Sequence, residues 1–153
     1  MNKTYAERHE NEDYQLLEEL NSVFKLQELG RTPMKHQTDA SGYTANHQYI
    51  EIELKRRYIN KNTYSSIIIE PYKLQYAKEH KNIIQLYVNF TDDNCAIVFN
   101  LTKIDKPNKT ELNIPSQLYE RTKMSNRYEL PITQAWIYQK TNNTYKLIQK
   151  GLK

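Results

Sequence analysis

The stretch YIEIELKRRY, residues 49–58, constrains the fold of this chain more than any other. Aliphatic residues occupy alternate positions at Ile50, Ile52 and Leu54. The positions between them are charged, at Glu51, Glu53 and Lys55. Alternation with a period of two predicts a β-strand with one apolar face and one polar face, and side chains on one face lie roughly 6 to 7 Å apart. We therefore expect a strand that enters a core on one side and lines up three charges on the other.

The charged face of this strand has two interpretations. Two carboxylates are suitable ligands for a hard divalent cation, and a lysine beside them can hold a phosphate or orient a water molecule. A strand exposed to solvent also often carries Glu and Lys, which pair with neighbouring strands and contribute roughly 0.2–1 kcal/mol each. The elements before and after the strand decide between the two.

Helical and strand-like patterns alternate along the first two-thirds of the chain. Residues 6–29 are expected to form an amphipathic helix, because apolar residues recur there at three- and four-residue steps, and Gly30 and Pro33 follow as a helix stop. The elements expected next are strands at 34–45, 48–58 and 65–70, a helix at 71–80, and strands at 83–90 and 95–101. This order predicts an α/β fold with a mixed central β-sheet flanked by helices.

The C-terminal third has a different character. Residues 103–128 are polar and are expected to form a long loop with a short helix near 116–121, followed by a hairpin of residues 130–139 and 145–148 around Asn142-Asn143. Residues 103–153 carry ten Lys or Arg against four Asp or Glu, a net charge of +6 within a chain of +4. A basic C-terminal part suits a polyanionic partner and predicts nonspecific affinity for nucleic acid. With 153 residues and no Gly/Ser linker, the chain is expected to be one domain, 1–153, with a core at about 6–101 and a basic extension at about 102–153.

Asp39 lies fourteen residues before Glu53, in a polar segment that contains Gly42. Asp39 followed by Glu53-Leu54-Lys55 resembles the D…ExK signature of the PD-(D/E)xK nuclease superfamily, with Thr38 in place of the family's proline. The resemblance extends over residues 6–101. It implies a restriction-endonuclease-like αβββαβ core, with the aspartate on the second strand and ExK on the third, to which the C-terminal part is an added extension.

The same resemblance implies a function and a set of site residues. The expected function is hydrolysis of DNA phosphodiesters by a small endonuclease that uses Mg²⁺ or Mn²⁺. The implied catalytic residues are Asp39, Glu53 and Lys55. The implied metal ligands are the carboxylates of Asp39 and Glu53 and the backbone carbonyl of Leu54. Further candidate ligands are Glu51, which points the same way as Glu53, and Glu12 of the first helix, with Glu19 as a second choice.

Arg56, Arg57 and Lys73 are the candidate nucleic-acid-binding residues, because phosphate contacts require cations around the site. The expected partner is DNA, with RNA as an alternative, and homodimer formation is left open. A non-catalytic nucleic-acid- or protein-binding module on the same fold is the alternative function. An unrelated α/β domain whose charged strand is only a solvated face is a third interpretation.

The sequence also predicts a location. It contains no run of 18 apolar residues, no apolar segment near its start that would act as a secretory signal, and a single cysteine, Cys95. These features predict a cytoplasmic protein with no membrane partner. Richness in Asn, Lys, Ile and Tyr is typical of an AT-rich genome and favours a bacterial or phage-infected cell.

Overall fold

The computed structural model describes residues 5–33, 35–104, 108–116 and 121–151, with side chains for 9–33, 35–104 and 127–151. In chain order the helices and strands are α1 (Tyr5–Phe24), β1 (Gln27–Arg31), β2 (Ala40–Tyr43), β3 (Tyr49–Arg56), β4 (Ser66–Ile69), α2 (Pro71–Glu79), β5 (Ile84–Phe90), β6 (Cys95–Asn100), β7 (Asn108–Ser116), β8 (Arg121–Pro131), β9 (Trp136–Thr141) and β10 (Thr144–Gln149). Short 3-10 turns at Leu101–Lys103 and Ile132–Gln134 precede β7 and β9.

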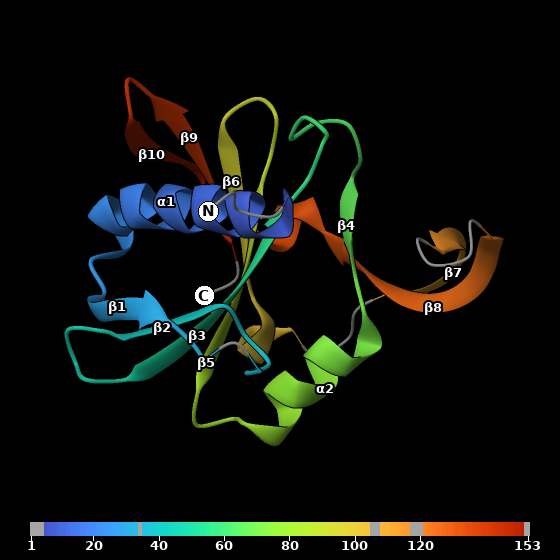
Figure 1. The fold of residues 1–153 in the computed structure, drawn as a ribbon, viewed down its shortest axis with the longest axis horizontal. Coiled ribbons are helices and arrows are strands. Elements are labelled where there is room, and N and C mark those ends of the chain that lie inside the picture. Colours follow the sequence, from blue (N-terminus) through green and yellow to red (C-terminus); the bar gives the residue numbers. More distant parts are fainter. Residues whose placement is uncertain (1–4, 34, 105–107, 117–120, 152–153) are drawn as a thin grey trace.

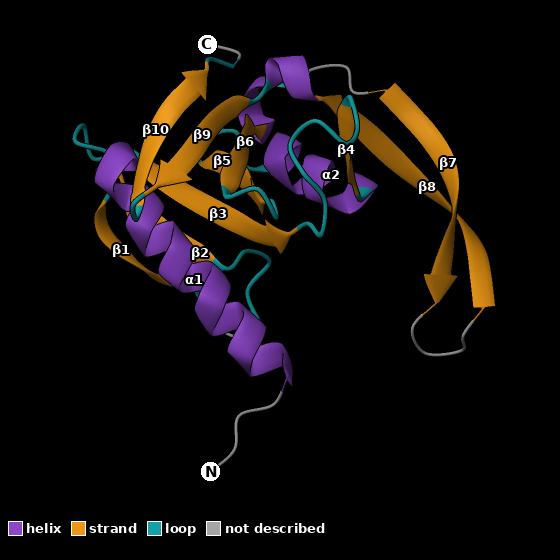
Figure 2. Ribbon diagram, turned by 90° about the horizontal axis from the view of Figure 1, so that it is seen from above, coloured by secondary structure: helices purple, strands orange, loops and turns teal. Residues whose placement is uncertain are grey.

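The main sheet has seven strands in the order β1-β2-β3-β5-β6-β9-β10 (Figure 1). Its neighbouring strands pair antiparallel, except β3 and β5, which run parallel. A smaller antiparallel sheet has the order β4-β8-β7, and its β7–β8 hairpin extends away from the rest of the molecule (Figure 2). The predicted α/β fold with a mixed central sheet and flanking helices is confirmed, and the C-terminal strands β9 and β10 belong to the main sheet.

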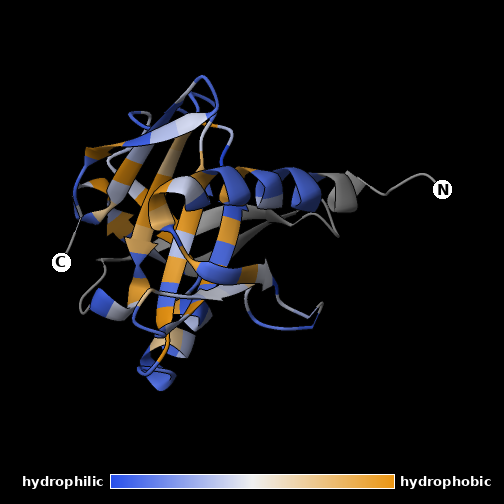
Figure 3. Cartoon of the chain, turned by 90° about the vertical axis from the view of Figure 1, so that its left-hand side faces the viewer, coloured by the Kyte–Doolittle hydropathy of each residue, from blue (hydrophilic) through white to orange (hydrophobic). Residues whose placement is uncertain are grey.

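Two apolar layers hold the sheet between the helices. On one face α1 packs through Leu17 and Leu20 against the side chains of β3, β5, β6, β9 and β10. On the other face α2 and β4 pack through Leu74 and Ile69 against β5, β6 and β9. The visible side of α1 is mostly hydrophilic, whereas the strands beneath it carry hydrophobic bands (Figure 3). Within the described parts of the chain, neither helix is long and apolar enough to cross a membrane.

The third strand, β3, has the two faces that its sequence predicts. Ile50 and Ile52 are buried in the layer beneath α1. Glu51 and Glu53 project toward α2, since successive residues of a strand point to opposite faces, and contact Tyr76 and Lys73 of that helix. The charged face of this strand is therefore partly covered by α2 and is not a fully solvated surface.

The predicted helix at 6–29 is too long, because α1 ends at Phe24 and residues 27–31 form the edge strand β1. Lys25 adopts a positive φ of 56°, a conformation that ends helices. The side chain of Asn21 then accepts a hydrogen bond from Leu26 N at 2.8 Å and donates one to Leu26 O at 3.1 Å. The helix therefore ends six residues before Gly30, the residue that the sequence pattern marks as its stop.

Two other predicted segments also differ in the structure. The expected strand at 34–45 is limited to β2, residues 40–43. In the connection before it, the β1–β2 loop, the described residues 32, 33 and 35–39 form no strand. The expected long loop at 103–128 contains most of the β7–β8 pair, whose side chains alternate too little in polarity to reveal strands. The predicted short helix near 116–121 is not formed at residues 116 and 121, which end the two strands, and its residues 117–120 lie outside the described residues.

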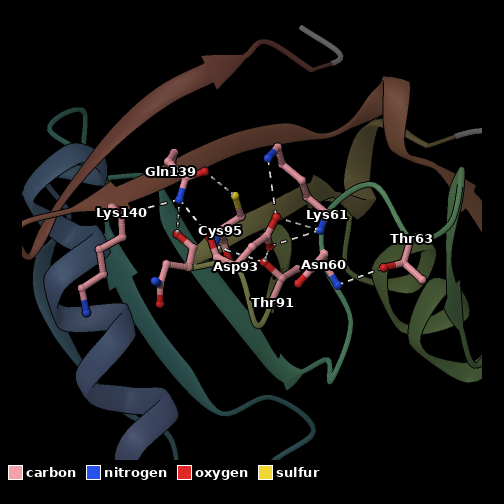
Figure 4. Close-up of polar contacts among 9 residues, drawn as sticks. Asn60, Lys61, Thr63, Thr91, Asp93, Cys95, Gln139 and Lys140 are labelled. Atoms are coloured by element: carbon pink, nitrogen blue, oxygen red, sulfur yellow. Dashed lines mark hydrogen bonds and ion pairs between the residues drawn. The ribbon is translucent and has the colours of Figure 1, made fainter.

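Asp93, in the turn between β5 and β6, is hydrogen-bonded to the segment that follows β3 (Figure 4). Its carboxylate accepts hydrogen bonds from Thr91 Oγ1 at 2.5 Å and from Lys61 N at 3.1 and 3.2 Å, and its backbone carbonyl accepts one from Gln139 Nε2 at 2.9 Å. Partial burial alone would raise the pKa of Asp93, but the bonds from Thr91 and Lys61 outweigh it and lower the pKa below its ordinary value. The ionised carboxylate therefore stabilises the fold.

Replacing Asp93 by Asn should lower the free energy of unfolding by about 1–2 kcal/mol at pH 7, because two charge-assisted hydrogen bonds lose their charge. The pKa of Asp93 is lower in the folded than in the unfolded chain, so its contribution is complete above the unfolded pKa of about 3.9 and is lost as the pH falls through the folded pKa. Urea unfolding at several pH values measures this, with Asp92→Asn as the control, since Asp92 is an exposed neighbour of equal charge. A difference from wild type that persists unchanged in acid would contradict the prediction.

Candidate functional site

A cleft of about 320 Å³ opens between the first half of α1, the β1–β2 loop and the second half of β3. Its lining contains Asp39, Glu53 and Lys55. Glu10 and Asp13 of α1 line it as well. The structure therefore brings the three predicted catalytic residues together, from two segments that are fourteen residues apart in the sequence.

Asp39 is positioned by the way in which β2 begins. The β2–β3 ladder starts at the pair Ala40 and Ile52, so Leu54 lies beyond its end. Asp39 N donates to Ile52 O at 2.9 Å, and Asp39 Oδ2 accepts from Leu54 N at 2.8 Å. The carboxylate of Asp39 thus accepts a backbone hydrogen bond of β3 that no residue of β2 reaches. This bond holds the carboxylate next to Glu53.

Glu53 is largely buried, with 18 % of its side chain exposed. Burial and then the negative charge of Asp39 raise the pKa of Glu53, while the ammonium of Lys73 opposes the shift. The two carboxylates are thus near enough to repel each other, an arrangement that a bound cation relieves.

Lys73, in the first turn of α2, is a direct partner of Glu53. Its Nζ lies 3.0 Å from Glu53 Oε1 and 3.1 Å from Glu70 Oε2. Burial alone would lower the pKa of Lys73, but the neighbouring carboxylates, Glu53 first, raise it above its ordinary value. Lys73, predicted to contact phosphate, is therefore a charged residue that is already bound to two carboxylates.

Lys55 lines the cleft on the same face of β3 as Glu53. Burial would raise the pKa of Glu70, but the ammonium of Lys73 and, more weakly, that of Lys55 lower it below its ordinary value. The ammonium of Lys55 therefore lies close enough to Glu70 to favour its ionised form, and its position in the cleft leaves it accessible to a ligand.

Glu51 does not line this cleft. Only 2 % of its side chain is exposed, and it is bound by residues from two elements. Its Oε2 lies 2.9 Å from His36 Nε2 and accepts a hydrogen bond from Thr38 Oγ1 at 2.6 Å, both in the β1–β2 loop. Tyr76 OH of α2 donates to Glu51 Oε1 at 3.2 Å and to Glu51 Oε2 at 3.3 Å. Glu51 thus connects the loop that carries Asp39 to α2.

Arg56 is the last residue of β3 and Arg57 follows it, and both make contacts within the chain. Arg56 Nη2 lies 3.1 Å from Asp13 Oδ1. Arg57 donates to Asn89 Oδ1 at 3.0 Å, to Ile68 O at 2.7 Å and to Tyr87 OH at 2.5 Å. The guanidinium groups of both candidate nucleic-acid-binding arginines therefore have partners within the chain.

Glu12 and Glu19, the candidates from the first helix, line a different cleft of about 300 Å³ on the other side of α1. Glu19 pairs there with Lys140 at 2.5 Å. The cleft around Asp39 instead contains Glu10 and Asp13, which are three residues apart and share a helix face. The sequence signal for these two residues is their three-residue spacing on the flank of the apolar stripe, whereas Glu12 lies in line with that stripe.

The donors around Asp39 match the chemistry of a hard divalent cation. The carboxylates of Asp39 and Glu53 and the carbonyl of Leu54 supply oxygen only, the ligand atom that Mg²⁺ prefers. Among the described side chains, no group of three or more His, Cys, Asp and Glu is gathered as a metal cage. Mg²⁺ is commonly bound by one or two carboxylates together with water and substrate phosphates, so a carboxylate pair is a sufficient protein contribution.

Comparison of the sequence with protein-family models and with curated proteins finds no match in either. The residues of the cleft and the order of the elements that carry them are therefore the basis for assigning a function.

Proposed function

We propose that this protein is a small metal-dependent endonuclease that hydrolyses phosphodiester bonds of DNA in the cleft around Asp39, Glu53 and Lys55. One observation carries the proposal, namely that these three residues line a single cleft. Within it, burial and, after it, the charge of Asp39 raise the pKa of the Glu53 carboxyl. Such a pair, with an ammonium beside it, is suited to bind a cation and a phosphate together.

The arrangement of elements supports the same proposal. In the order α1, β1, β2, β3, α2, β5, three antiparallel strands follow a helix, and a second helix leads to a strand parallel to the third. This order is similar to the αβββαβ core of the PD-(D/E)xK nucleases, and Asp39 precedes its second strand while Glu53 and Lys55 lie in its third. The short strand β4 is an addition between β3 and α2. We propose the restriction-endonuclease-like core on this basis.

Each residue has a role in the proposed reaction. Asp39, Glu53 and the carbonyl of Leu54 would hold Mg²⁺ or Mn²⁺. The bound cation would lower the pKa of a coordinated water and neutralise charge on the phosphate. Lys55 orients the attacking water or holds the scissile phosphate, so that the new P–O bond forms opposite the leaving 3′-oxygen, which then takes up a proton.

The test combines cleavage and binding by the wild-type protein. We expect nicking of supercoiled plasmid with Mg²⁺ or Mn²⁺, no nicking with a chelator, and saturable binding of Mn²⁺ in calorimetry. Parallel reactions with single-stranded DNA and with RNA identify the substrate. Protein that binds no divalent cation and cuts no nucleic acid would refute the proposal, and DNA binding without cleavage would favour a non-catalytic binding module.

The exposed lysines of the C-terminal part are the expected source of nonspecific DNA affinity. Replacing Lys103, Lys146 and Lys150 together by Gln should weaken DNA binding, and the slope of log affinity against log salt should fall by about one for each lysine that contacts a phosphate. Fluorescence anisotropy at several salt concentrations measures both quantities. The matched control replaces the exposed residues Lys25, Lys78 and Lys81, and an equal loss in that control would contradict a specific role for the C-terminal charges.

A further inference from the structure

The ammonium of Lys73 occupies a cation site built from other parts of the chain. It lies between the carboxylates of Glu53 and Glu70, at 3.0 and 3.1 Å. It also lies over the rings of Tyr87 and Tyr72, with 5.5 and 5.8 Å from Nζ to the ring centroids, within the range of cation–π attraction. Only 11 % of the Lys73 side chain is exposed. Two carboxylates and two aromatic rings thus surround a cation that the chain itself supplies.

One of these carboxylates also belongs to the cleft. Glu53 lines it together with Asp39, whereas Glu70 is absent from its lining. A divalent cation shared by Asp39 and Glu53 would lie next to the Lys73 ammonium in a largely buried environment, where like charges repel more strongly than in water. The present contact between Lys73 and Glu53 and a divalent cation at Glu53 are therefore in competition.

We propose that Lys73 is an internal counter-ion that exchanges with the divalent cation at Glu53. The inference rests on the proposed metal-dependent function. Without metal, Lys73 compensates the charge of Glu53. When the cation binds between Asp39 and Glu53, Lys73 leaves Glu53 and keeps only its contact with Glu70, three residues earlier in the chain. The exchange prevents monovalent cations from occupying the site, because only a cation of higher charge displaces the bound ammonium.

Calorimetric titration with Mn²⁺ tests the exchange through binding rather than activity. Lys73→Met keeps the length of the side chain and removes its charge, so it should bind Mn²⁺ about tenfold more tightly or better, since a charge-assisted hydrogen bond no longer has to be broken. Lys73→Arg should bind like wild type. The control Lys78→Met removes an equal charge from the exposed side of the same helix and should change little.

The outcomes separate this inference from the proposed function. Wild-type protein that binds Mn²⁺, combined with folded Lys73→Met that binds it no more tightly, overturns the exchange and leaves the metal site intact. If neither protein binds Mn²⁺, both proposals fail. Binding by Lys73→Met alone would show that Lys73 blocks the site in the wild-type protein, which also overturns the exchange.

A second measurement needs only the wild-type protein, and so decides the question if Lys73→Met does not fold. Reductive methylation of lysines, followed by peptide mass spectrometry, reports how available each ammonium is. Saturating Mn²⁺ should raise the methylation rate of Lys73 severalfold, because one of its two carboxylate contacts is lost, while the rate at Lys78 stays the same. An unchanged rate at Lys73 in protein shown to bind Mn²⁺ overturns the exchange.

Discussion

Replacing Asp39 by Asn or Lys55 by Ala should lower the rate of metal-dependent DNA cleavage by about 10²–10⁴-fold, the range found when a group that acts directly on the reacting atoms is removed. Asp39→Asn keeps an oxygen that can accept the hydrogen bond from Leu54 N, so the loop geometry should persist. The charge that holds the cation is lost, and Mn²⁺ should bind more weakly. Plasmid nicking under single-turnover conditions and calorimetry with Mn²⁺ measure the two effects.

Lys55→Ala should separate cleavage from binding. Lys55 is one cation among 22 Lys and Arg residues, so its removal should leave DNA affinity nearly unchanged while cleavage stops. Because Asp39 and Lys55 act in one reaction, the cleavage rate of the double variant should be little lower than that of either single variant. Glu18→Gln, an exposed carboxylate of α1, is the control for an unrelated loss of charge. Cleavage that survives in both single variants would show that the chemistry occurs elsewhere.

The central part of the site could be predicted from the sequence because it depends on local geometry. The period of two in β3 determines that Glu53 and Lys55 share a face, whatever strands lie beside them. Asp39 is implied by the resemblance to the D…ExK signature, and the short strand β2 brings it alongside β3. The strand pairs β5–β6 and β9–β10 were predictable for the same reason, since their apolar runs are separated by short polar turns.

The partners of the charged residues could not be predicted, because they come from distant parts of the chain. Arg56 contacts Asp13 of α1, 43 residues away, and Arg57 contacts Asn89 of β5, 32 residues away. The strand β4 lies outside the main sheet and pairs with β8, about 60 residues later in the chain. No local sequence pattern encodes this pairing. The edge strand β1 lies within the segment expected to be helical, and α1 ends before it because the Asn21 side chain bonds both the N and the O of Leu26.

Glu51 is the residue for which the sequence pattern and the structure lead to different expectations. The pattern makes it a spare metal ligand, because it lies in line with Glu53. The structure buries it and gives its carboxylate hydrogen-bonding partners in His36, Thr38 and Tyr76. Replacing a buried acceptor of this kind leaves several polar groups without their partner, and such losses are costly.

Glu51→Ala should therefore lower the free energy of unfolding by about 2–4 kcal/mol. Glu51→Gln keeps the size of the side chain and one accepting oxygen, so it should destabilise the protein less. If Glu51 is structural, folded Glu51→Gln should still bind Mn²⁺ nearly as well as wild type, because Asp39 and Glu53 are unchanged. Urea unfolding and Mn²⁺ calorimetry on the same samples measure both quantities. A Glu51→Gln variant with wild-type stability but without Mn²⁺ binding would instead identify Glu51 as a ligand. The comparison thus separates the two roles, because a metal ligand acts on cation affinity, whereas a buried partner of the β1–β2 loop and α2 acts first on stability.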